Sequence, residues 1–175
     1  MKKEVAEMRT LPMLRTGTPM LLALLATACV LPSPGPPPPR VEVLAPDPRF
    51  GVAGADVLNH PDVAPKIRGL FGADWTAAAT ARGGTAVPAG DFFGRAEPPR
   101  RLGIDGTEYV AVTGCAAACR THRGLLLVRA DGEQVRARLD EAGYTHYYAF
   151  GVGAVVDQPI RAQLDAAWAA LERQR

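Results

Sequence analysis

The chain has 175 residues, 22% of them charged, with a formal net charge of +2 and only three cysteines. This length favours one domain with appended segments over two full domains. The 20 basic residues are scattered along the chain rather than grouped in blocks, which argues against an arginine-based anion site.

The first 28 residues have the organisation of an export signal. Four basic side chains between Lys2 and Arg15 precede the apolar stretch "MLLALLATA", which is too short to persist as a transmembrane helix. The motif "LATAC" resembles a bacterial lipobox, in which the cysteine, here Cys29, becomes lipid-modified and forms the new N-terminus. Because Val30 rather than aspartate follows, we expect an outer-membrane lipoprotein that faces the periplasm. Ordinary cleavage that leaves Cys29 unmodified is the alternative, and both routes export the protein.

Export changes the charge balance of the protein. Removal of residues 1–28 takes away four basic and two acidic residues and leaves 16 of each, so the mature protein is neutral. A neutral domain has no overall attraction toward a nucleic acid, and no nucleic-acid partner is expected. Recognition of any partner must therefore be local.

A proline-rich segment follows Cys29: residues 31–40 are "LPSPGPPPPR". Such a run favours extended polyproline II and cannot bury a core, so it predicts a stiff spacer. The chain therefore divides into a signal peptide (1–28), a lipidated cysteine with its spacer (29–40) and a folded domain (41–175).

The first half of the domain predicts one helix and one hairpin. Residues 60–72 predict the helix, because Pro61 and Asp62 suit a first turn, an apolar stripe follows, and Gly72 is a stop signal. Residues 75–91 are small and glycine-rich, which indicates a loop or an edge. The pair Asp105-Gly106 is a tight-turn signal between two extended runs, so residues 100–115 predict a hairpin.

The second half predicts three strands and a helix. Residues 124–128, "GLLLV", are wholly apolar, as expected at the centre of a sheet. Residues 134–139 alternate, which predicts a half-buried strand with Arg136 and Arg138 on its solvent face. A strand over residues 144–150 and a helix capped by Asp157 follow. The pattern predicts an α+β fold, an antiparallel sheet of about five strands with helices packed on one face.

Cys115 and Cys119 lie at the tip of the central hairpin, separated by Ala116, Ala117 and Ala118. In an oxidising compartment they should form a disulfide, since lipidation would block the thiol of Cys29. The small ring would either hold a recognition loop rigid or simply pin a turn between two core strands. A zinc site with His122 is a third interpretation, but the C-x3-C-x2-H spacing lacks a fourth ligand, and we expect neither metal nor cofactor.

This hairpin carries a family resemblance. Residues 105–128, "DGTEYVAVTGCAAACRTHRGLLLV", resemble the central hairpin of the inhibitor of vertebrate lysozyme (Ivy) family, in which a strand leads into a cysteine-bracketed loop, an arginine and an apolar strand. The helical residues before Trp75 and the Gln158-Pro159 helix start are similar to the ends of many members. The resemblance implies an α+β fold, often dimeric, and periplasmic inhibition of lysozyme.

The loop itself departs from the family. Ivy loops carry a histidine and an aspartate between the cysteines, and the histidine enters the lysozyme cleft. Here three alanines take their place, and the nearby cations Arg120 and His122 lie outside the ring. The departure implies another peptidoglycan-cleaving target or loss of inhibition. His122 could instead pack beside its strand.

The sequence does not predict an enzyme. His60, His122 and His146 fall in separate elements, and the adjacent acids Asp140 and Glu141 are typical of a solvated strand end. The leading expectation is an envelope-anchored inhibitor or immunity protein that binds a lysozyme or muramidase-type enzyme. The alternative is a structural envelope lipoprotein without inhibitory activity.

Overall fold

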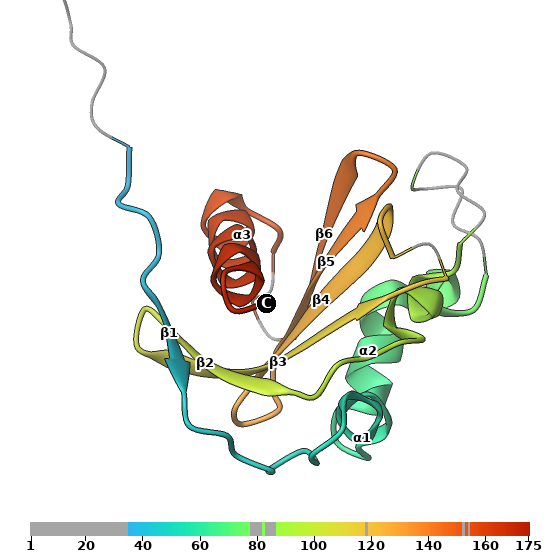
Figure 1. Cartoon of the computed structure of the whole chain (residues 1–175), viewed down its shortest axis with the longest axis horizontal. Coiled ribbons are helices and arrows are strands. Elements are labelled where there is room, and N and C mark those ends of the chain that lie inside the picture. Colours follow the sequence, from blue (N-terminus) through green and yellow to red (C-terminus); the bar gives the residue numbers. More distant parts are fainter. Residues whose placement is uncertain (1–34, 78–81, 83–86, 118, 152, 154) are drawn as a thin grey trace, which may run out of the picture. The chain divides into compact units, whose positions relative to one another are not determined.

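The computed structural model describes residues 35–77, 82, 87–117, 119–151, 153 and 155–175 (Figure 1). Every helix and strand among the described residues lies in the compact unit Pro36–Arg175. The predicted signal peptide and Cys29 lie outside the described residues. No helix within the described part of the chain is long and apolar enough to cross a membrane.

One antiparallel sheet of six strands forms the centre of the unit, and the strands pair in chain order. The strands are β1 (Val41–Leu44), β2 (Arg100–Ile104), β3 (Thr107–Cys115), β4 (His122–Arg129), β5 (Val135–Glu141) and β6 (Tyr144–Phe150). The α+β class and the antiparallel sheet are therefore confirmed. β1 was not predicted: it is only four residues long and pairs with a strand more than fifty residues later.

Helices cover both faces of this sheet, which corrects the expected packing on one face (Figure 1). On one face lie α1 (Gly54–Asn59), α2 (Ala64–Phe71) and the short 3-10 helices η1 (Gly72–Trp75) and η3 (Ala89–Phe93). On the other face lies α3 (Gln158–Glu172).

The central strands explain why both faces are covered. Along β4, Leu126 and Val128 face the α2 core, whereas Leu125 and Leu127 face the α3 core, and all four are fully buried. A strand that is apolar on both sides needs a covering layer on each.

The predicted N-terminal helix begins later than expected, and a second, unpredicted helix precedes it. α2 begins at Ala64, with Pro65 in its first turn, and the residues from His60 to Val63 form a turn ahead of it. The preceding helix α1 was not predicted. Its start is held by Asp56, whose carboxylate accepts hydrogen bonds from the backbone N–H groups of Val52 (3.1 Å) and Ala53 (2.8 Å).

The prediction that Arg136 and Arg138 point to solvent is wrong. The guanidinium of Arg136 lies 5.3 Å from the ring centre of Tyr109, and that of Arg138 lies 5.0 Å from Trp168 of α3. Arg138 also donates to Asp165 of the same helix at 2.9 Å. The flat guanidinium and apolar stem of arginine allow it to line a protein layer while its charge stays paired.

Candidate functional site

A disulfide closes the tip of the β3–β4 hairpin, as predicted. Cys115 and Cys119 are bonded, with their Cα atoms 4.9 Å apart. Directly below the ring the strands are in regular register, with Cys115 opposite Arg123, and the N–H of Ala116 donates to the carbonyl of His122 at 3.1 Å. The ring therefore stands on an ordered hairpin.

The predicted loop residues differ in their exposure. Ala117 and Arg120 are exposed, whereas Ala116 is only 8% exposed and cannot itself contact a partner extensively. His122 is half-buried, and Ala118 lies outside the described residues. Among the described residues of the loop from Ala116 to Arg120, the exposed side chains are thus one small apolar group, Ala117, and one cation, Arg120.

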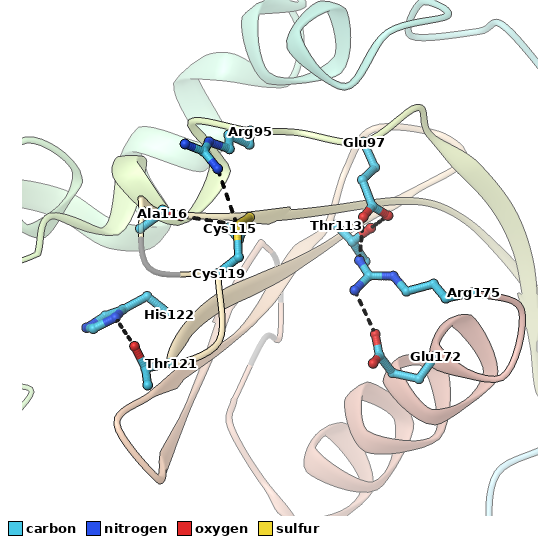
Figure 2. Close-up of a disulfide and its surroundings, with 10 residues drawn as sticks. All are labelled: Arg95, Glu97, Thr113, Cys115, Ala116, Cys119, Thr121, His122, Glu172 and Arg175. Carbon is cyan, nitrogen blue, oxygen red and sulfur yellow. Dashed lines mark hydrogen bonds and ion pairs between the residues drawn. A yellow bond between two sulfur atoms is a disulfide. The ribbon is translucent and has the colours of Figure 1, made fainter.

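A second cation reaches the ring from outside the hairpin. Arg95 belongs to the segment before β2, whose backbone follows the end of β3 through hydrogen bonds from Arg95 N–H to the Cys115 carbonyl (3.3 Å) and from Glu97 N–H to the Thr113 carbonyl (2.8 Å). Its exposed guanidinium lies 3.9 Å from the sulfur of Cys119 (Figure 2). Arg95 was not predicted as a site residue, because no local sequence pattern links it to a ring that begins twenty residues later.

Neither Arg95 nor Arg120 lies within ion-pair distance of a carboxylate in the described part of the chain. Beside the ring is a hollow of about 430 Å³, lined by Cys115, Ala116 and Ala117 of the loop and by Asp91, Arg95 and His122 around them. The tip of the hairpin therefore combines a shallow, largely apolar surface with two cations that are available to an external anion.

His122 faces inward, toward a buried carboxylate. Its Nδ1 lies 2.9 Å from the hydroxyl of Thr121 (Figure 2), and its Nε2 lies 3.8 Å from Oε1 of Glu141, the residue opposite it in the β4–β5 register. His146 of β6 places its Nε2 3.7 Å from Oε2 of Glu141. The imidazole of His122 thus packs beside its strand, one of the two positions that the sequence left open.

Glu141 is not the solvated strand end that the sequence indicated. Its side chain is 3% exposed and lies 3.5 Å from Nε of Arg82, which is 2% exposed. The alternation that buries Val135, Ala137 and Leu139 continues to Glu141, so the sequence did contain a signal for its burial. Its neighbour Asp140 instead pairs with Arg138 on the α3 face.

In this structure the Thr121–His122–Glu141 arrangement lacks the close contacts of a proton relay. A hydroxyl, an imidazole and a carboxylate that act together require contacts of about 2.6–3.2 Å. The His122–Glu141 separation of 3.8 Å exceeds that range. In addition, no cluster of three or more His, Cys, Asp or Glu within the described ranges could hold a metal ion.

Close to the ring, Glu97 joins Thr113 of β3 to Arg175 at the C-terminus (Figure 2). Its carboxylate accepts hydrogen bonds from the Thr113 hydroxyl (2.7 Å) and from the Arg175 guanidinium (2.6 Å). Burial favours the neutral acid, but these hydrogen bonds and the charge of Arg175 outweigh it and lower the pKa of Glu97.

Comparison of this chain with protein-family models, with curated proteins and with solved structures found no significant match.

Proposed function

We propose that this chain is an envelope-anchored inhibitor or immunity protein that binds a lysozyme or another peptidoglycan-cleaving enzyme through the Cys115–Cys119 loop. The observation that carries the proposal is the disulfide-closed tip of the β3–β4 hairpin, which presents Arg120 and, beside it, Arg95. The signal peptide and Cys29 would place this domain where such enzymes act.

The chemistry of the tip is complementary to that of the proposed target. Most glycoside hydrolases cleave with a pair of carboxylates in the cleft that holds the sugar chain. A projecting cation can meet these carboxylates, and the small side chain of Ala117 leaves room for the loop to approach them. The ring also limits the conformations of the loop, which reduces the entropy lost on binding.

The two arginines take over a role that Ivy proteins assign to residues inside the ring. In this chain the ring itself contains only alanines between its cysteines. His122 is directed toward Glu141, so it is less available to a target than the exposed Arg120 and Arg95. We therefore assign the anion-binding role to these two arginines.

The test is an inhibition and binding assay with the unit Pro36–Arg175 against a panel of lysozymes and bacterial muramidases. We expect one enzyme to be inhibited. Arg120→Ala and Arg95→Ala should each weaken its binding by about thirtyfold or more, since loss of one partner of a buried charge pair costs about 2–5 kcal/mol. Arg40→Ala is the matched control, because Arg40 is also exposed but lies beside the β2–β3 turn, at the other end of β3.

A bulky side chain supplies a second test of the same loop. Ala117→Trp should abolish inhibition while the far-ultraviolet circular dichroism stays unchanged. If this variant inhibits as strongly as the unmodified protein, the loop is not the binding element. If no enzyme in the panel binds, the result favours a structural envelope lipoprotein.

A further inference from the structure

The disulfide at the tip of the β3–β4 hairpin lies where a thiol from solution can reach it. Cys115 and Cys119 are both partly exposed, whereas the six strand residues before Cys115 are buried. The hollow of about 430 Å³ beside the ring is lined by Cys115 and opens to solvent. Thiol–disulfide exchange requires such access, because the attacking thiolate must reach one of the two sulfurs.

One of these sulfurs has a cation beside it. The exposed guanidinium of Arg95 lies 3.9 Å from Sγ of Cys119 (Figure 2). The backbone of Arg95 is attached to the same hairpin, because its N–H donates to the carbonyl of Cys115 at 3.3 Å. A positive charge stabilises a nearby thiolate, and a sulfur with a stabilised thiolate leaves faster in exchange. Cys119 is therefore favoured as the leaving sulfur.

A neutral contact at the same sulfur acts in the opposite direction. The carbonyl oxygen of Ala116 lies 3.4 Å from Sγ of Cys119, so in the reduced protein it could accept a hydrogen bond from the protonated thiol. A thiol is a weak donor, whereas a hydrogen bond in which one partner is charged is about twice as strong as a neutral one. The contact with Arg95 should therefore outweigh the contact with the Ala116 carbonyl.

Opening of the ring should leave the rest of the hairpin in place. Seven residue pairs join β3 to β4 in regular register, and their side chains belong to both cores. The ring closes only the loop above these pairs. The bond can therefore be broken and formed again while the domain stays folded.

We propose that the Cys115–Cys119 bond is a site of thiol–disulfide exchange with a dithiol reductant, and that Arg95 stabilises Cys119 as the leaving thiolate. One thiolate of the reductant attacks Sγ of Cys115, and the electron pair of the S–S bond leaves with Cys119. The second thiolate of the reductant then attacks the first and releases Cys115 from the mixed disulfide. The protein gains two electrons and two protons, and the reductant becomes a disulfide.

Exchange would regulate target binding, and this consequence rests on the proposed function. A reduced loop has more conformations than the ring, so binding to an enzyme would cost more entropy. The exchange itself can be measured on the isolated protein, without any enzyme. Failure of the exchange chemistry and failure of the inhibition assay are therefore distinguishable.

The first test compares single-cysteine variants of the unit Pro36–Arg175, which contains both cores and no cysteine besides this pair. Cys115→Ser leaves Cys119, and Cys119→Ser leaves Cys115. Thiolate absorbance in the ultraviolet gives the ionised fraction near pH 7, which we expect to be about threefold or more higher for Cys119 than for Cys115.

Arg95 should account for this difference. Added to Cys115→Ser, Arg95→Ala should lower the thiolate fraction of Cys119 about threefold, and Arg95→Lys should retain part of the effect because it keeps the charge. Arg40→Ala is the matched control: it removes an exposed guanidinium at the other end of β3 and should leave the fraction unchanged. A fraction that does not respond to Arg95→Ala would overturn the role of Arg95.

The second test locates the mixed disulfide. The oxidised unit is treated with the monothiol 2-mercaptoethanol, free thiols are alkylated at once, and tandem mass spectrometry identifies the modified sulfurs. We expect the mercaptoethanol adduct on Cys115 and the alkyl group on Cys119. An adduct mainly on Cys119 would overturn the assignment of the leaving sulfur. A bond that reacts only after the protein is unfolded in urea would overturn exchange in the folded state.

Discussion

Glu141, the last residue of β5, forms an ion pair with Arg82 inside the fold. Their side chains are 3% and 2% exposed, and a buried charge requires a partner because removal from water costs several kcal/mol. Two half-buried histidines, His122 and His146, stand at 3.8 and 3.7 Å from the two oxygens of the carboxylate. The cluster therefore joins β4, β5 and β6 at the end of the sheet from which the ring projects.

Loss of the Glu141 carboxylate should destabilise the protein strongly. Glu141→Ala removes the carboxylate that lies 3.5 Å from the buried Arg82 guanidinium, and breaking such a buried ion pair typically costs about 3–5 kcal/mol. Glu108→Ala is the control: its 2.6 Å ion pair with Arg101 is partly exposed, so its loss should cost about 1 kcal/mol or less. Urea unfolding measures both free energies, and equal losses would contradict the structural importance of the buried pair.

The pKa of Glu97 is lowered, and the direction of this shift can be tested by titration. Because the folded pKa lies below the unfolded one, the stabilising contribution of Glu97 is present above the ordinary glutamate range, about pH 4.3, and is lost as the pH falls through the folded value. Thr113→Val removes one hydrogen bond to the carboxylate and should raise the pKa of Glu97. Carboxyl NMR follows this change; a pKa that stays the same or falls would mean that Thr113 does not stabilise the anion.

At the scale of elements, the β3–β4 hairpin is held by many contacts besides its disulfide. Seven residue pairs connect the two strands, and their side chains belong to both cores. The ring encloses only five residues, Cys115 to Cys119.

Removal of the disulfide should therefore have a limited effect on stability. A five-residue ring restricts the unfolded chain by about 2 kcal/mol in the loop-entropy description. We expect the Cys115→Ser/Cys119→Ser double variant to lose no more than this amount in urea unfolding. A much larger loss would show that the bond organises the fold, and the recognition role of the loop would be weakened.

The elements that could be predicted from sequence are those with a local signal. The Asp105-Gly106 turn is visible in the sequence because it requires positive φ angles, which are 49° and 82°. α1 and β1 have no comparable signal: one is six residues long, and the other is defined by pairing with distant β2. The sequence also could not show that α3 covers the second face of the sheet. The alternation in β5 places Arg136 and Arg138 on one side of the strand, but it does not show whether a helix or solvent lies there.

For the whole molecule, attachment to the membrane would depend on Cys29, a residue that precedes the folded unit in the sequence. If Cys29 is diacylated, the protein should partition into membranes, and Cys29→Ser should release a soluble periplasmic form. Fractionation of cells followed by immunoblotting measures both. If the wild-type protein is already soluble and has a free thiol at Cys29, the lipidation hypothesis is wrong.

The candidate site is only partly visible in the sequence, because the path of the chain assembles it. The cysteines and Arg120 are neighbours in sequence, so their proximity could be predicted. Arg95 reaches the ring because its segment runs along the end of β3 before it enters β2. Arg82 contacts Glu141, although the two residues are 59 positions apart in the sequence. Such contacts follow from the tertiary fold and have no local pattern.

The division of the interior by the sheet also gives the protein two natural fluorescence reporters. The chain has two tryptophans. Trp75 stacks on Phe71 at 5.7 Å in the α2 core, and Trp168 lies beneath Arg123, 4.6 Å away, in the α3 core. Replacement of either one by phenylalanine leaves the emission of the other, so the α2 and α3 layers can each be followed separately as the protein unfolds.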